Sequence, residues 1–115
     1  MWFFRRKKGS DGLVTAKILH DVASGNTLLL DVRTLDEYER EHAKNSVNVP
    51  FLMLHKLKNR NFHKNKMIYV YCAAGGRSNR AVEILHNAGY KNVFDIKSLE
   101  FWKMAGGEVE TILKR

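Results

Sequence analysis

The amino-acid sequence predicts a single α/β domain built around a mostly parallel β-sheet. Its 115 residues are the length of one domain, and 44% hydrophobic with 28% charged residues is the balance of an ordinary globular protein. Short apolar runs alternate with segments of helical periodicity, which is typical of βαβ units. The sequence has no internal repeat and no low-complexity stretch. We therefore expect one domain with one core and room for one modest active site.

The first part of the domain is expected to form a helix, a strand and a second helix. Residues 14–22 have apolar side chains at helical spacing and are followed by Ser-Gly-Asn, which ends a helix. Residues 27–32 are largely apolar, which suits a strand buried on both faces. Thr34 and Glu37 have the spacing of a capping box, which predicts a short helix ending near residue 41.

The middle of the chain is expected to contain two strands and a helix. Residues 46–49 alternate in polarity and predict a short strand that Pro50 ends. Residues 51–57 have apolar side chains at helical spacing, and a polar, basic connection follows at 59–66. Residues 67–71 are the clearest strand in the sequence.

The last part of the domain is expected to be a helix, a strand and a short helix. Ser78 is the expected N-cap of the first of these helices, and Gly89 the residue that ends it. Residues 92–96 predict the last strand, and residues 98–104 predict the final helix.

The chain is basic, with 20 lysines and arginines against 12 acidic residues and a net charge of +8. A positive surface attracts small anions, acidic protein surfaces, nucleic acid or anionic lipid, although such lysines often serve only solubility. The basic residues are scattered, with no aromatic residues regularly interleaved among them. We therefore expect no nucleic-acid binding.

The single cysteine, Cys72, excludes an internal disulfide and suits a reducing compartment, so a cytoplasmic location is expected. The aromatic and basic residues 2–8 are too short for a signal-peptide core or a membrane span. They allow a weak contact with a membrane surface, but we expect a tail over 1–12. The domain is then expected over 13–110, with a C-terminal tail at 111–115.

A loop between the clearest strand and the following helix carries the candidate chemistry. Its residues are Cys72, Ala73, Ala74, Gly75, Gly76, Arg77 and Ser78. In open α/β sheets, ligands bind beyond the carboxyl ends of the strands, which is where this loop begins. Its glycines allow successive backbone N–H groups to point inward and, with the helix N-terminus, to bind an anion.

The anion in such a loop can be the cysteine sulfur itself. A free thiol with a pKa near 8.5 is only about 3% thiolate at pH 7, whereas a pKa of about 6.5 gives roughly three quarters. Arg77 would add a positive charge if its side chain turns inward. The alternative for Cys72 is an inert buried thiol, which its position at the head of a Gly-Gly-Arg-Ser loop disfavours.

Six short segments share a pattern: 29–34, 37–38 with His42, 46–50, 69–72, 76–78 and 88–93. In these segments the chain resembles the rhodanese family of sulfurtransferases in its single-domain form, from about residue 14 to 109. The resemblance implies a five-stranded, mostly parallel sheet with helices on both faces.

The resemblance also implies a function. Cys72 would be the nucleophile and would carry a persulfide, which the backbone N–H groups of residues 73–78 would stabilise. Thiosulfate or a persulfide would be the sulfur donor, and a thiol, a protein or cyanide would be the acceptor. Asp31, Arg33 and Glu37 would be structural, and no cofactor is implied.

Two segments depart from the family pattern. Residues 43–45 are Ala-Lys-Asn where the family usually has Ile-Pro-Gly, which is expected to change one surface turn. Residues 97–102 lack a Gly-Gly pair ahead of the tryptophan and are one residue shorter. This second departure is expected to change the shape of the entrance to the site, and so the choice of substrate.

Because the loop side chains are mostly small, we expect a shallow site with weak discrimination between small donors and room for a bulky thiol or protein acceptor.

Other functions are weaker alternatives. Cysteine phosphatases and arsenate reductases of a similar fold place five residues between cysteine and arginine, whereas this loop has four. A binding-only or sulfur-relay module is a further alternative, which the retained Cys72 disfavours. No metal is expected because the five histidines lack metal-ligand spacing. These are His20, His42, His55, His63 and His86.

Overall fold

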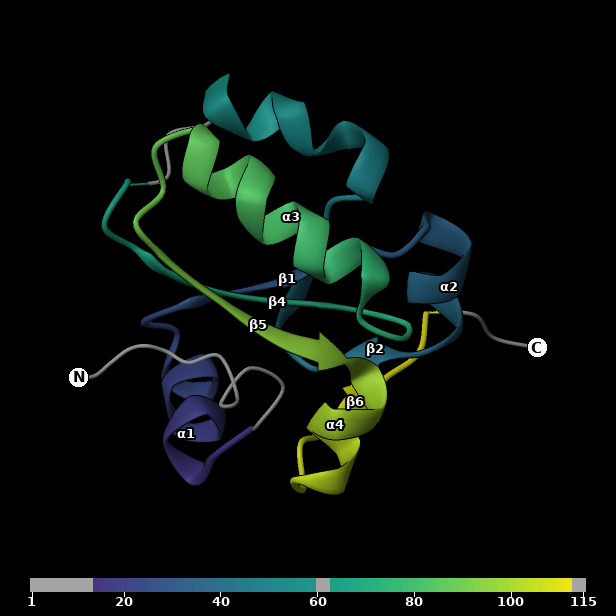
Figure 1. The fold of residues 1–115 in the computed structure, drawn as a ribbon. Helices are drawn as coiled ribbons and strands as arrows, with labels where there is room; N and C mark the ends of the chain where they lie inside the picture. The colour runs from purple at the N-terminus through teal and green to yellow at the C-terminus, as the bar shows by residue number, and fades with distance from the viewer. Residues whose placement is uncertain (1–13, 60–62, 113–115) are drawn as a thin grey trace.

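The computed structural model describes residues 14–59 and 63–112 (Figure 1). The expected tail over 1–12, with residues 2–8, therefore lies outside the described residues. At the other end, the backbone N–H of Ile112 and the hydroxyl of Thr111 both donate to the carbonyl of Glu39, at 3.0 and 3.1 Å. The chain thus stays bonded to the domain for two residues beyond the boundary expected at 110.

The predicted helices and strands occur in the predicted order, and two short strands that were not predicted, β2 and β6, are added to them. In order they are α1 (Ala16–Ser24), β1 (Leu28–Asp31), α2 (Leu35–Arg40), β2 (His42–Ala43), β3 (Ser46–Asn48), the 3-10 helix η3 (Phe51–Asn59), β4 (Met67–Cys72), α3 (Gly76–Asn87), β5 (Asn92–Ser98), α4 (Leu99–Met104) and β6 (Val109–Glu110). This order confirms the α/β class.

The central sheet has the order β3-β1-β4-β5, and every neighbouring pair in it is parallel. The expectation of five strands is corrected to four within the described residues. The short segments β2 and β6 pair antiparallel with each other in a separate sheet, so neither extends the central one.

Helices cover both faces of the central sheet, as expected (Figure 1). The helices η3 and α3 lie on one face, and α1 and α4 lie on the other. Alternation along the strands divides the core accordingly: Leu30 and Val70 pack under α3, whereas Leu29 and Tyr69 pack toward α1. Burying a side chain of this size contributes about 1.5–3 kcal/mol, so each layer holds the sheet firmly.

Local sequence signals correctly locate the start of α2 and the end of α3. The capping box is confirmed: the Glu37 N–H donates to Thr34 Oγ1 at 3.2 Å, and the Thr34 N–H donates to Glu37 Oε1 at 2.9 Å. Gly89 follows α3 with φ +101°, the left-handed conformation expected of a helix terminator.

Three local predictions need correction. The helix predicted over 14–22 is α1, which spans Ala16–Ser24. The helix predicted over 51–57 is a 3-10 helix and continues to Asn59. Ser78 is not the N-cap of α3, because the helix begins at Gly76 and Gly75 occupies the cap position. Ser78 lies instead in the first turn and is fully buried, where its polar groups face the Cys72 loop.

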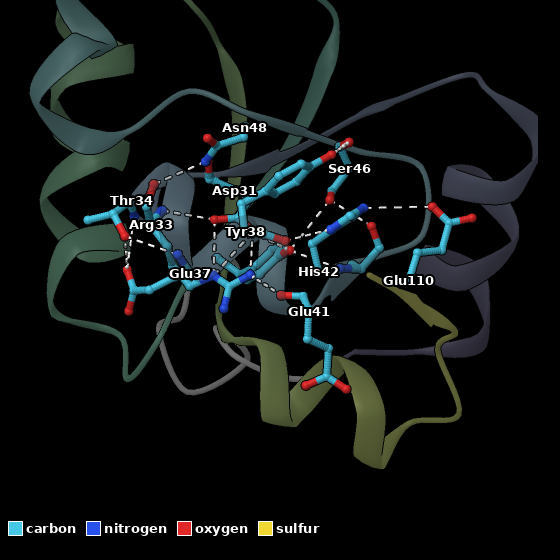
Figure 2. A network of polar contacts seen from close by, with 12 residues as sticks. Asp31, Arg33, Thr34, Glu37, Tyr38, Glu41, His42, Ser46, Asn48 and Glu110 are labelled. Atoms are coloured by element: carbon cyan, nitrogen blue, oxygen red, sulfur yellow. Dashed lines mark hydrogen bonds and ion pairs between the residues drawn. The ribbon is translucent and has the colours of Figure 1, made fainter. Parts of the chain in front are cut away.

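A buried polar cluster, the Asp31 network, lies at the carboxyl end of β1 (Figure 2). It consists of Asp31, Arg33, Tyr71 and the carbonyl of Glu41. The Asp31 carboxylate accepts hydrogen bonds from Arg33 Nη2 at 2.8 Å and from the Tyr71 hydroxyl at 2.6 Å. Arg33 Nη2 also donates to the Glu41 carbonyl at 2.5 Å. Burial, aided by the Asp31 charge, raises the pKa of Tyr71, which keeps its hydroxyl protonated as a donor.

Candidate active site

Cys72 is the last residue of β4, the strand between β1 and β5. Residues 73–75 then turn into α3, at the edge of the sheet where the parallel strands end (Figure 1). This is the edge at which open α/β sheets bind their ligands. The structure therefore places Cys72 and its loop where the sequence predicts a site.

The Cys72 sulfur is enclosed by main-chain groups. The N–H groups of Gly75 and Ser78 donate to Sγ at 2.9 and 3.3 Å. The Lys97 carbonyl lies 3.5 Å from Sγ and accepts from the thiol when it is protonated. Gly75 has φ +104°, a conformation that L side chains rarely adopt, and this turn directs its N–H at the sulfur.

These donors favour the ionised sulfur. Burial by itself raises the pKa of the Cys72 thiol. The Ser78 hydroxyl and the N–H groups of Ser78, Gly75 and Ala74 outweigh that effect, and they hold the pKa below its ordinary value. The loop donors therefore favour the thiolate form of Cys72 over the neutral thiol.

The side chain of Ser78 has a role in the site beyond the main-chain role expected of residues 73–78. Its side chain is fully buried and donates to the carbonyl of Gly75 at 3.2 Å, and it also lies 3.4 Å from the Lys97 carbonyl. Ser78 thus links the loop, the first turn of α3 and the end of β5 around the sulfur. A serine followed by a helical pattern predicts an N-cap, which is why the sequence alone misplaces it.

Arg77 faces α2 rather than the sulfur. Its two terminal nitrogens bind the two carboxylate oxygens of Glu37, Nη1 to Oε1 at 2.9 Å and Nη2 to Oε2 at 3.2 Å. Hydrogen bonding from Arg77 lowers the pKa of Glu37 to about 2, so the carboxylate stays charged. Glu37 therefore has the structural role expected of it, with a partner 40 residues away that no local pattern indicates.

Cys72 is only 1% exposed and lies at the wall of a pocket of 480 Å³. The pocket is lined by Cys72 and the loop residues Ala73, Ala74, Gly76 and Arg77, together with Phe51 and Arg80. The loop residues Gly75 and Ser78 lie behind the sulfur and supply hydrogen bonds instead. Phe51 is the lining residue that sequence reasoning missed, because it comes from η3 and follows a different strand.

Two non-glycine residues with positive φ, Asn45 and Lys97, occupy the segments that depart from the family pattern. Both have φ +72°, and each stands in a segment where the family usually has glycine. Asn45 lies in the turn between β2 and β3, so the departure there concerns a surface turn, as expected. Lys97 lies beside the site: its side chain passes over Gly75, and its carbonyl faces Sγ.

The described residues contain neither a cluster of metal-ligating side chains nor a membrane-spanning helix. No group of three or more His, Cys, Asp or Glu side chains converges as a metal site in residues 14–59 and 63–112. None of the helices in these ranges is both long and apolar enough to cross a membrane. His20 and His86 are exposed, and buried His42 stacks on Tyr38 with ring centroids 3.8 Å apart.

Known proteins share the sequence pattern and fold of this domain. The family model described as Rhodanese-like domain matches residues 15–105. Adenylyltransferase and sulfurtransferase uba4 from Ogataea parapolymorpha is 38% identical over 68 residues, which are 59% of this chain and 18% of that protein. Thiosulfate sulfurtransferase PspE from Escherichia coli is 38% identical over 68 residues, which are 56% of this chain and 62% of that protein. The chain thus spans less than two thirds of either relative.

A solved structure has the same architecture. The crystal structure of a Rhodanese_3 like domain from Anabaena sp. superposes with a TM-score of 0.69 and 32% sequence identity. The superposition covers 73% of this chain and 98% of that domain. The parallel sheet with helices on both faces is therefore shared by the two domains.

Proposed function

The chain belongs to the rhodanese-like domain family, and on this basis we propose that it is a sulfurtransferase that carries sulfane sulfur as a persulfide on Cys72. Sulfur transfer in general is supported by relatives whose names describe sulfurtransferases. The observation that carries the more specific proposal is the set of N–H groups directed at Sγ, with Gly75 N at 2.9 Å and Ser78 N at 3.3 Å.

The first half-reaction transfers a sulfur atom from the donor to Cys72. The Cys72 thiolate attacks the outer sulfur of thiosulfate, and the S–S bond of thiosulfate breaks. Sulfite leaves with the electron pair of that bond, and a persulfide anion remains on Cys72. The lowered pKa of Cys72 supports this step because only the thiolate is nucleophilic.

The second half-reaction transfers the outer sulfur of the persulfide to an acceptor. A thiolate or cyanide attacks the outer sulfur of the persulfide, the bond to Cys72 breaks, and Cys72 leaves as a thiolate. The product is an organic persulfide or thiocyanate. While the persulfide exists, its negative charge would be stabilised by the loop N–H groups, including those of Gly76 and Arg77 in the first turn of α3, which have no carbonyl partner within the helix.

The contacts of Arg77 disfavour the phosphatase alternative. A phosphatase of this kind needs its loop arginine to bind the transferred phosphate, whereas here Arg77 is bound to both oxygens of Glu37. The loop also keeps only four residues between Cys72 and Arg77. A protein acceptor in a sulfur relay remains part of the proposal, as does action in the cytoplasm, where a lone thiol stays reduced.

Mass spectrometry of the intact protein tests the proposal. After incubation with thiosulfate or an organic persulfide, Cys72 is expected to gain one sulfur atom, which cyanide then removes as thiocyanate. The Cys72→Ser variant is expected to gain none while keeping its fold by circular dichroism. A wild-type protein that gains no sulfur from either donor would refute the assignment.

A further inference from the structure

The two arginines at the pocket of the Cys72 loop are in different electrostatic states. Arg77 forms a two-point ion pair with Glu37, so its charge is largely matched within the protein. Arg80 is exposed, and within residues 14–59 and 63–112 no carboxylate pairs with it. Its guanidinium lies over the Phe51 ring instead, 5.9 Å from the centroid. Arg80 is therefore the pocket cation that is available to a ligand.

The pocket is larger than an inorganic donor needs. Its 480 Å³ falls within the range of about 300–1,000 Å³ that is usual for pockets of organic ligands. Thiosulfate is a compact ion of five non-hydrogen atoms in its chemical formula, so it would fill only the part next to the sulfur. The remaining space is bounded by the Phe51 ring and the methyl groups of Ala73 and Ala74, which suit an apolar group.

These observations combine three features in one pocket: a nucleophilic sulfur, an apolar wall and one unpaired cation. We propose that Arg80 is a specificity-determining residue that anchors a carboxylate of an organic sulfur donor, whose carbon skeleton packs against Phe51. This inference rests on the proposed function and specifies its substrate class: persulfides and thiosulfonates that carry an additional anionic group. It replaces the weak discrimination between donors that the small loop side chains led us to expect.

The transfer step is balanced without a further reactant. For a persulfide donor, the Cys72 thiolate attacks the outer sulfur of R–S–S–H and the donor's S–S bond breaks. R–S⁻ leaves with the electron pair, and the proton stays on the outer sulfur, which is now part of the Cys72 persulfide. The carboxylate of R takes no part in this chemistry, so Arg80 acts on binding rather than on bond cleavage.

A pair of alkylating reagents tests the anchor independently of sulfur transfer. Iodoacetate and iodoacetamide share the same leaving group and differ in carrying a carboxylate or a neutral amide. Because Cys72 is the only cysteine, each alkylation rate reports on this site alone. The ratio of the iodoacetate rate to the iodoacetamide rate is expected to fall about three- to tenfold in Arg80→Ala and to be largely kept in Arg80→Lys.

Matched controls separate a local anchor from general attraction to a basic protein. Arg40→Ala removes one exposed positive charge from α2, outside the pocket, and is expected to leave the ratio unchanged. Circular dichroism confirms that each variant is folded. An unchanged ratio in Arg80→Ala, or an equal fall in Arg40→Ala, would overturn the proposal.

Sulfur transfer gives the corresponding kinetic test. Benzenethiosulfonate and its 4-carboxylated derivative are compared as donors, with thiocyanate release as the readout. The wild type is expected to have a several-fold lower KM for the carboxylated donor, and Arg80→Ala to lose this preference with kcat unchanged. Equal losses for both donors would contradict the anchor. If no donor yields thiocyanate but the alkylation ratio still depends on Arg80, the sulfurtransferase assignment fails and the anion anchor stands.

Discussion

The Asp31 network and the Cys72 loop lie at the carboxyl ends of two neighbouring strands, β1 and β4, yet they use polar groups in opposite ways. In the network every charged group has a matching partner: the Asp31 carboxylate meets Arg33 and the Tyr71 hydroxyl. In the loop, N–H groups converge on one sulfur atom, and no side-chain cation of the described residues contacts it directly. The first arrangement holds the chain in place, whereas the second favours the ionised form of a single thiol.

Breaking the network is expected to have the largest effect on stability. Asp31→Asn removes the charge that neutralises Arg33, whose side chain is only 8% exposed. Leaving such a charge unpaired costs about 3–5 kcal/mol. Urea unfolding is expected to show this loss, whereas the alkylation rate of the remaining folded protein changes little.

The matched control for this change is Asp36→Asn. It breaks the Arg40–Asp36 pair, in which both side chains are 70% exposed, and such surface pairs contribute little. A similar loss of stability in both variants would mean that burial does not distinguish the Asp31 pair.

Distorting the loop is expected to have a smaller effect on stability but a clear effect on reactivity. Gly75→Ala forces a side chain into the left-handed conformation at φ +104°, which costs about 1–2 kcal/mol. Relief of that strain would turn the Gly75 N–H away from Sγ, so sulfur transfer is expected to fall by at least about tenfold.

Gly76→Ala provides the neighbouring control. Gly76 begins α3, has no positive φ, and a Cβ there would meet nothing within 4 Å. Alanine at this position is expected to be neutral or to stabilise the protein by up to about 1 kcal/mol. Equal losses of activity in the two variants would argue against a specific role for the Gly75 turn.

Removing the Ser78 hydroxyl is expected to raise the pKa of Cys72. Ser78→Ala deletes a hydrogen bond that lowers the Cys72 pKa, so the inflection in the alkylation rate is expected to move to higher pH. The exposed neighbour Asn79→Ala is the control and should leave the inflection in place. An unshifted inflection in Ser78→Ala would show that the main-chain donors suffice.

The lowered pKa of Cys72 in the folded state also makes the free energy of unfolding depend on pH. Because the folded-state pKa of Cys72 is lowered, the unfolded chain binds more protons between that value and its own pKa of about 8.5. The free energy of unfolding is therefore expected to rise with pH through this window. The rise should shrink in Ser78→Ala, which equilibrium unfolding at a series of pH values would measure.

The smallest effect is expected at the ion pair between Arg77 and Glu37. Glu37→Gln keeps an oxygen for the capping box but removes the charge, and a pair about one-third exposed is worth at most about 1 kcal/mol. The pair stabilises the wild type above the ordinary glutamate pKa of about 4.3. This advantage is lost as the pH falls through the folded-state pKa of about 2, so the unfolding curves of the two proteins should converge there.

Features that depend on neighbouring residues could be predicted from the sequence. The capping box of Thr34 and Glu37 and the terminator Gly89 were correct because each acts within one turn of helix. The strand before Cys72 was recognisable from its apolar run. Ser78 was misplaced because a buried serine that faces a sulfur has the same local pattern as a serine that caps a helix.

Contacts between distant segments could not be predicted in this way. The partner of Arg77 is 40 residues away, and Phe51 reaches the pocket from η3 only because the parallel strands bring their carboxyl ends to one edge. Nor does the sequence alone indicate that Lys97 adopts φ +72° and directs its carbonyl at Sγ.

The sequence by itself determined the α/β class, the order of the helices and of the central-sheet strands, and the candidate nucleophile, since periodicity, turn residues and a lone cysteine in a glycine-rich loop are local properties. Only the tertiary structure decided which donors surround the sulfur, which arginine is neutralised and which remains available. The physical reason is that hydrogen bonds and ion pairs depend on distances between atoms, and for residues far apart in the chain those distances are set by packing of the sheet and its two helical layers.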